Sequence, residues 1–288
     1  MTDGNTPPPT TKVPIYEVAL TTSDLDIEVR INDVPVMRVH GGHVETKFDV
    51  NPHVFTGKNH LGVVVRPPGN APKYSPGARA EVELRVLGFP GKDLVDSRGR
   101  LVFESSGVEA GEAFARSSTP EGEEPVVRQA RAGLAFRSRI LVDLMTPFPP
   151  WGWLSADTLN DGPVVFDELL TEFQALWSLV QSKDTATLEA VAAEQAIDWQ
   201  IAYGLDSEDE GQRMLGVADT LGDPDVEALP LPDVGDLRLQ LLGFRKLARL
   251  VDAEGKDPIT LGVRNAPHMT GRFTAMFCRR DGAWVMIR

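Results

Sequence analysis

Residues 166–180 read FDELLTEFQALWSLV, and this stretch decides how the second half of the chain is interpreted. Its apolar side chains recur at the i, i+3, i+4 and i+7 spacing that places them on one face of an α-helix. The residues on this face are Phe166, Leu169, Leu170, Phe173, Leu176, Trp177 and Val180. The pattern predicts a long amphipathic helix that buries one side.

Two further helices are predicted after this one. Asp184 is a suitable N-cap for the second helix, and Ser207 with Glu210 has the spacing of a capping box for a third helix that reaches about Leu221. The buried stripe of the second helix would consist of Leu188, Val191, Ala192, Gln195, Trp199 and Ala202. Residues 222–235 then form a loop rich in Pro, Asp and Gly.

Strands return after the loop, and this order of elements predicts an α+β domain whose helices pack on an antiparallel sheet. The predicted strands are 237–242, 246–252, 259–263, 272–278 and 284–288. Asp281-Gly282 between the last two is the strongest hairpin signal in the sequence, because Asp-Gly favours the positive φ angles of a two-residue turn.

The first half of the chain has the two-residue period of strands. Leu25, Ile27, Val29 and Ile31 alternate with charged residues, so one face is buried and the other is wet. The predicted strands are 15–20, 25–31, 34–39, 43–50, 61–65, 80–87, 100–104, 124–131 and 133–144. Many short strands separated by turns predict an antiparallel β-sandwich.

Each half resembles a known family over short motifs. Residues 182–188 (SKDTATL) and the hairpin 279–287 (RRDGAWVMI) resemble the second-helix start and the final hairpin of NTF2-like (SnoaL-like) cone domains, a likeness that spans 163–288. Gly57, Asn59 and Leu61 resemble the turn that ends a strand in the jelly-roll sandwiches appended to glycoside hydrolases. The first resemblance implies a curved sheet that can enclose a pocket, and the second implies a fold more than sugar binding.

Length supports two domains, because 288 residues exceed the usual ~100–200 residues per domain. We predict a disordered tail at 1–11, a β-sandwich domain at 12–146, a Pro- and Trp-rich linker at 147–162 and an α+β domain at 163–288. The fold class is therefore a two-domain protein, with an N-terminal all-β antiparallel sandwich and a C-terminal α+β part.

Charge is unevenly distributed along the chain. The net charge is −13, and residues 160–235 contain 17 acidic and 2 basic side chains, whereas 236–288 contain 5 acidic and 10 basic. A broad nucleic-acid binder needs net positive charge, so this class is excluded. We expect a cytoplasmic protein without a membrane span, because no apolar run approaches ~18–20 residues and Cys278 is the only cysteine.

The acidic block suggests a binding surface for a basic protein partner, with Asp206, Glu208, Asp209 and Glu210 as its candidate residues. The same run lacks the spacing of a calcium loop, and a solvated helix face is the alternative interpretation. Trp151 and Trp153 form an aromatic pair in the linker. This pair is either an exposed binding contact or, as we prefer, a buried lock between domains.

Chemistry-bearing motifs are sparse. Asp198, Tyr203 and His268 are the candidates for a pocket in the cone, although Asp198 precedes a predicted buried tryptophan and so favours a side chain in solvent. No phosphate loop, dinucleotide fingerprint or nucleophile elbow is present, so we predict no catalytic residue and no cofactor. Cys278 is interpreted as a small core residue.

Four of the five histidines lie within 21 residues, which raises the idea of a metal site. The four are His40, His43, His53 and His60. Their spacing matches no metal-ligand motif, so turn and strand histidines are the favoured interpretation and no metal is predicted.

These observations favour a non-catalytic binding or interaction protein, for example an immunity or adaptor protein for a bacterial toxin, since NTF2-like folds occur among immunity proteins. The first alternative is a small-molecule isomerase or hydrolase that uses the cone pocket. The second is a carbohydrate-binding β-sandwich, which ranks last because the first half has few exposed aromatic candidates.

Overall fold

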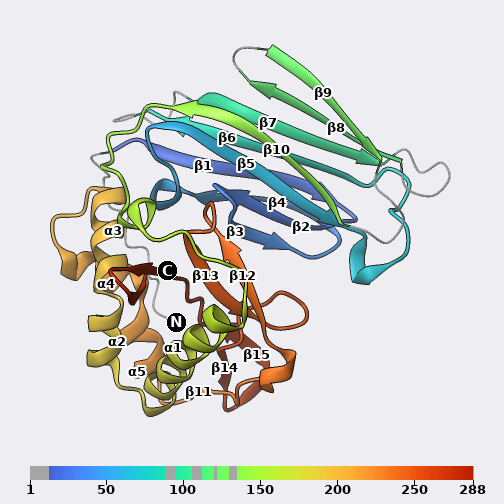
Figure 1. Cartoon of the computed structure of the whole chain (residues 1–288). Coiled ribbons are helices and arrows are strands. Elements are labelled where there is room, and N and C mark those ends of the chain that lie inside the picture. Colours follow the sequence, from blue (N-terminus) through green and yellow to red (C-terminus); the bar gives the residue numbers. More distant parts are fainter. Residues whose placement is uncertain (1–12, 89–94, 106–111, 120–121, 130–134, 288) are drawn as a thin grey trace. The chain divides into compact units, whose positions relative to one another are not determined.

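The computed structural model describes residues 13–88, 95–105, 112–119, 122–129 and 135–287 (Figure 1). Contacts divide the chain into two compact units, and each is described by itself. Unit 1 consists of Met1–Ile31, Pro35–Pro147 and Ala202–Leu205. Unit 2 consists of Asn32–Val34, Phe148–Ile201 and Asp206–Arg288. The division at Pro147 falls at the beginning of the predicted linker.

Unit 1 is built from strands. Their bounds are β1 Ile15–Ser23, β2 Asp26–Ile31, β3 Val34–Val39, β4 His43–Asp49, β5 Gly57–Arg66, β6 Arg79–Leu87, β7 Val95–Ser105, β8 Glu112–Thr119, β9 Gly122–Gln129 and β10 Phe136–Leu144. A six-stranded sheet has the order β4-β1-β6-β7-β8-β9, and a four-stranded sheet has the order β10-β5-β2-β3. The strand pairs run antiparallel, as the sequence predicts.

The two sheets of unit 1 pack face to face. Along β10 the even-numbered side chains from Phe136 to Leu144 are buried and the odd-numbered ones are exposed, which is the alternation of a strand with one wet face. The rings of Phe103 in β7 and Phe136 in β10 lie 5.1 Å apart. Gly99 of β7 lies directly under β10, because a Cβ there would meet a methyl group of Val142 at 2.7 Å. These contacts fix the close spacing of the two sheets.

The Gly57–Asn59–Leu61 motif lies at the beginning of a strand, whereas the resemblance to jelly-roll sandwiches predicts it at the end of one. These residues lie in the first half of β5, and Gly57 has a φ of 108°, which favours glycine. The buried Asn59 amide donates to the backbone oxygens of Phe55 and Gly57 at 2.7 and 2.9 Å and accepts from the Phe55 N–H at 3.1 Å. The predicted turn chemistry of Asn59 is therefore present, and it leads the chain into β5.

Within the described residues, the α-helices begin in unit 2. Their bounds are α1 Pro163–Ser182, α2 Thr185–Val191, α3 Ala193–Tyr203, α4 Glu208–Leu215 and α5 Val217–Gly222. Asp184 caps α2 as predicted: its carboxylate accepts hydrogen bonds from the Thr187 backbone N–H at 3.1 Å and hydroxyl at 2.7 Å. The predicted second helix is divided at Ala192 into α2 and α3, and the predicted third helix is divided at Gly216 into α4 and α5. Gly216 has a φ of 65° and ends α4 in the left-handed conformation, which interrupts the helix.

The strands of unit 2 form two small sheets, whereas the sequence predicts one. Their bounds are β11 Val226–Ala228, β12 Arg238–Leu242, β13 Leu247–Val251, β14 Thr260–Val263, β15 Ala266–Arg272, β16 Phe277–Arg280 and β17 Ala283–Met286. The sheet orders are β11-β14-β15 and β12-β13-β16-β17. The single strand predicted at 272–278 is wrong, because residues 273–276 leave one sheet and enter the other.

The core of unit 2 lies under α1. The predicted apolar face is confirmed in its centre: Leu169, Phe173, Leu176 and Val180 are buried. The Phe173 ring packs 5.5 Å from that of Phe277 in β16, so the helix covers the four-stranded sheet. Each such side chain contributes ~1.5–3 kcal/mol by leaving water, which explains why α1 forms where the period is strongest.

The final hairpin is confirmed. Asp281 and Gly282 have φ angles of 52° and 80°, which are those of a two-residue turn with positive φ at both central positions. Arg280 pairs with Ala283 across it, as the last pair of the β16–β17 ladder.

Candidate functional site

The acidic layer, defined here as residues 160–235, contains helices α1 to α5 and has 17 acidic but only 2 basic side chains. Asp206, Glu208 and Asp209 at the beginning of α4 are exposed, as a binding surface requires. Glu210 is half-buried. The structure therefore brings the four predicted residues together at one helix end and leaves three of them open to solvent.

Glu210 helps to cap the beginning of α4. The Ser207 hydroxyl accepts a hydrogen bond from the Glu210 backbone N–H at 3.3 Å. The Glu210 carboxylate accepts one from the Asp206 backbone N–H at 2.9 Å, one residue earlier than the reciprocal bond of an ordinary capping box. Its other oxygen lies 3.7 Å from a guanidinium nitrogen of Arg213, so Glu210 stabilises the helix locally.

A groove lies beside these residues, between α2, α4 and α5. Its wall carries three carboxylates, a glutamine, an arginine and two small residues: Glu189, Asp209, Gln212, Arg213, Gly216, Ala218 and Asp219. The Gln212 side-chain amide donates to the Glu189 backbone oxygen at 2.9 Å, and this bond joins α4 to α2 across the groove. The groove is net negative, and a hydrogen bond joins two of the helices that line it.

Close packing of α3 and α4 also holds the acidic layer in shape. The buried Gly211 of α4 lies against the backbone of α3, and a Cβ at that position would be 2.2 Å from the Ala196 carbonyl oxygen. Only glycine permits this approach. The helices that present the carboxylates are thus positioned by backbone contact, which does not depend on their charges.

The three residues predicted for a cone pocket do not converge. Asp198 and Tyr203 are both buried on α3, but five residues of helix separate their directions by roughly 140°. His268 is exposed on β15. The expectation that Asp198 points to solvent is wrong: its exposure is 6%, and the following Trp199 is the more exposed of the two.

The surroundings of Cys278 favour a structural role. Burial is the main cause that raises the pKa of its thiol to about 11; the charge of Arg280 opposes this rise, and the carboxylates of Glu194 and Asp198 add to it. The Arg280 guanidinium forms an ion pair with Glu194, which neutralises that carboxylate. A thiol with this pKa is protonated at neutral pH and is a poor nucleophile.

The predicted aromatic pair is not an exposed contact. Trp151 and Trp153 are each 2% exposed. Within unit 2, the Trp151 ring lies 5.5 Å from that of Phe148, and Trp153 lies against Gly243, where an added Cβ would meet its ring at 3.1 Å. Their contribution is therefore to packing.

The histidines of the first half are spread over different elements. His40 follows β3, His43 begins β4 and forms a 2.9 Å hydrogen bond with Ser23, His53 ends a short 3₁₀ turn, and His60 lies in β5. Within the part of the chain that the structure describes, no three His, Cys, Asp or Glu side chains are grouped as metal ligands.

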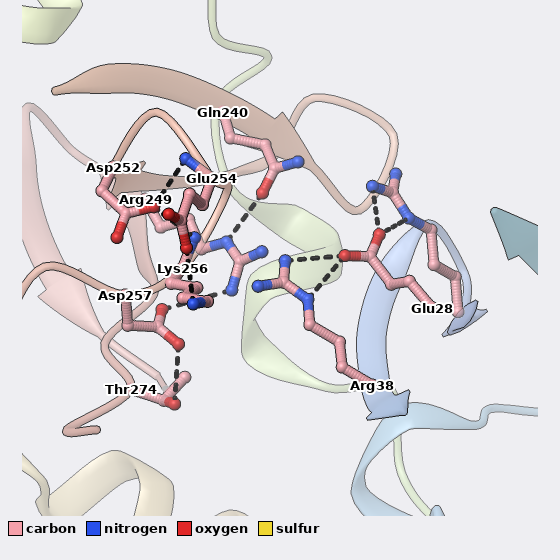
Figure 2. A network of polar contacts seen from close by, with 10 residues as sticks. Glu28, Arg38, Gln240, Arg249, Asp252, Glu254, Lys256, Asp257 and Thr274 are labelled. Atoms are coloured by element: carbon pink, nitrogen blue, oxygen red, sulfur yellow. Dashed lines mark hydrogen bonds and ion pairs between the residues drawn. The ribbon is translucent and has the colours of Figure 1, made fainter. Parts of the chain in front are cut away.

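Sequence reasoning missed a buried charge pair in unit 2. Arg249, at the centre of the apolar strand LARLV, is 2% exposed; its Nε donates to Gln240 at 2.8 Å and its Nη1 to Asp257 at 3.2 Å (Figure 2). The Thr274 hydroxyl donates to the other Asp257 oxygen at 3.1 Å. The arginine inside a strand whose other residues are apolar is the signal that could have identified this pair.

A second buried charge centre lies in unit 1. Glu28 is 7% exposed, and each of its carboxylate oxygens receives two nitrogens of one arginine: Arg30 at 2.5 Å, and Arg38 at 2.6 and 2.7 Å. Figure 2 shows the contacts of Glu28 with Arg38. Burial alone would raise the pKa of Glu28, but the two guanidinium groups outweigh burial and lower it.

No described helix is both long and apolar enough to cross a membrane. Comparison of the chain with protein-family models, curated proteins and solved structures gave no match. The candidate site therefore rests on its own geometry.

Proposed function

We propose that this chain is a non-catalytic binding protein whose acidic layer docks a basic protein partner. The observation that carries the proposal is the exposed carboxylate cluster at the beginning of α4 beside a net-negative groove. The layer as a whole has 17 acidic and 2 basic side chains. Its field attracts a cationic protein from a distance and orients it before contact.

Both basic side chains of this layer already have partners within it. Lys183 donates its ammonium group to the Asp223 backbone oxygen at 2.6 Å, and Arg213 faces Glu210. The carboxylates of Glu208 and Asp209 lie in the first turn of α4, where the helix dipole favours them, and remain exposed. Arginines of the later strands already pair with Glu168, Glu194 and Glu227 of the layer. A basic partner would therefore supply lysine or arginine side chains to the carboxylates at the beginning of α4.

The fold interpretation is part of the same proposal. A jelly-roll sandwich would occupy 12–146 and an NTF2-like domain 163–288, joined by the linker 147–162. An immunity or adaptor protein that neutralises a basic bacterial toxin is one concrete form of this function, and it rests on fold analogy and on charge. The buried Phe173–Phe277 contact occupies the middle of the helix–sheet interface, and the pocket residues are dispersed, so we propose no enzymatic function.

The test is capture of proteins from native lysate by the tagged chain at low and high salt, with mass spectrometry of the retained proteins. Glu208→Gln with Asp209→Asn should strongly reduce retention of a stoichiometric basic partner. Glu45→Gln with Asp143→Asn makes the same charge change at exposed sites of unit 1 and should leave retention intact. Retention that does not fall at high salt would contradict docking through the acidic layer, and so would an equal loss of retention in both double variants.

A further inference from the structure

The groove between α2, α4 and α5 differs from the rest of the acidic layer because it is concave and its carboxylates come from three helices. Glu189 belongs to α2, Asp209 to α4 and Asp219 to α5. Carboxylates that surround a hollow act together on a single cation that enters it, whereas carboxylates on a convex helix face act separately and are screened by water.

The basic residue in the groove wall is already held. The Arg213 Nε donates to the Asp209 backbone oxygen at 3.3 Å, and its terminal nitrogen faces Glu210 at 3.7 Å. Both contacts lie along α4 itself. Arg213 therefore stays on its own helix and leaves Glu189 and Asp219 to a cation from outside.

Small residues leave space for such a cation. Gly216 and Ala218 form the wall where α4 gives way to α5, and a Cβ added to Gly216 would meet no atom within 4 Å. The hydrogen bond from Gln212 to the Glu189 backbone fixes the distance between the two sides of the groove. An aliphatic stem fits against the small residues while its charged end reaches the carboxylates, as long basic side chains do elsewhere.

We infer that this groove is the anchor point of the partner and receives one lysine or arginine side chain between Glu189, Asp209 and Asp219. This inference rests on the proposed function and adds a specific pocket to it. The exposed carboxylates at the beginning of α4 attract the partner by long-range charge, and the groove determines where its basic segment is seated.

The experiment measures fluorescence anisotropy of two labelled peptides, one of alternating alanine and lysine and one of alternating alanine and arginine, at low and high salt. The groove variant is Glu189→Gln with Asp219→Asn, which replaces two carboxylates by amides of the same shape. The control is Glu172→Gln with Asp167→Asn on α1, which pairs a half-buried glutamate with an exposed aspartate as the groove variant does. Circular dichroism and thermal unfolding verify that both variants are folded.

We expect the groove variant to weaken binding of at least one peptide about tenfold, and the control to weaken it far less. The peptide more affected identifies the preferred side chain. Equal weakening in both variants would overturn the groove as the anchor point. The proposed function would remain, with the partner docked by diffuse charge. An unsubstituted chain that binds neither peptide in a salt-dependent way would overturn both.

Discussion

Carboxylates behave in opposite ways in two regions of this molecule, strand β2 in unit 1 and the beginning of α4 in unit 2. In unit 1, Glu28 is buried and receives four guanidinium nitrogens from two arginines. In unit 2, Glu208 and Asp209 are exposed at a helix end. The side-chain chemistry is the same, and the difference lies in whether the charge has left water.

Loss of water determines what each carboxylate contributes. Burial of a charge costs desolvation free energy, so buried charges occur with well-placed partners. Removal of one partner strongly lowers the free energy of unfolding. An exposed charge keeps its hydration and contributes little to folding. The buried groups therefore belong to the fold, and the exposed groups are available for binding.

The largest expected effect is that of Arg249→Met in unit 2. Methionine cannot replace the hydrogen bonds of Arg249 to Gln240 and Asp257, and the nearly buried Asp257 carboxylate loses its cation. We expect the free energy of unfolding to fall by about 4 kcal/mol. Denaturant titration followed by tryptophan fluorescence measures this, because all five tryptophans lie in unit 2.

A second variant separates the ion pair from simple loss of volume. Arg249→Met with Asp257→Asn removes both charges, and it should recover part of the loss because no unpaired carboxylate remains buried. A loss below about 1 kcal/mol for Arg249→Met alone would show that this buried pair resembles a surface pair, and the distinction between buried and exposed charge would fail.

The next effect is that of Glu28→Gln in unit 1. The amide keeps the shape of the side chain but removes the negative charge that Arg30 and Arg38 contact, and both guanidiniums are partly exposed and can be hydrated. We expect a loss of about 2 kcal/mol at neutral pH, which is smaller than at Arg249 for that reason. Far-UV circular dichroism of the strands follows the transition.

The pH dependence of this loss gives an independent test. The two arginines outweigh burial and hold the pKa of Glu28 below the ordinary value of 4.5, so the folded state binds fewer protons than the unfolded state. The contribution of Glu28 is complete above pH 4.5 and disappears as the pH falls through the lower folded pKa. The difference between the unsubstituted chain and Glu28→Gln should therefore shrink in acid, and a constant difference would contradict the ion-pair explanation.

Local patterns in the sequence were sufficient for elements whose stability is local or periodic. The α1 face, the Asp184 cap and the Asp281-Gly282 hairpin depend on residues within a few positions of one another. The divided helices show where this reasoning stops. Gly216 reads as a tolerated helix residue in sequence, yet in the structure it takes a left-handed conformation that ends α4.

Sites that depend on distant partners could not be predicted in this way. The approach of Gly211 to Ala196, the Arg249–Asp257 pair and the bond from Gln212 to the Glu189 backbone each join separate elements. The exposed run at the beginning of α4 was found because charge composition alone reveals it. The groove beside it was not, since Glu189 and Asp219 lie 30 residues apart in the chain.

The smallest expected effect is that of Glu208→Gln, which makes the same chemical change as Glu28→Gln on an exposed side chain. Loss of the favourable helix dipole at the first turn of α4 and relief from neighbouring carboxylates oppose one another. We expect the free energy of unfolding to change by less than about 0.5 kcal/mol, measured by the same denaturant titration. A loss near that of Glu28→Gln would mean that the carboxylates at the beginning of α4 serve the fold, and they would then no longer be free to bind a partner.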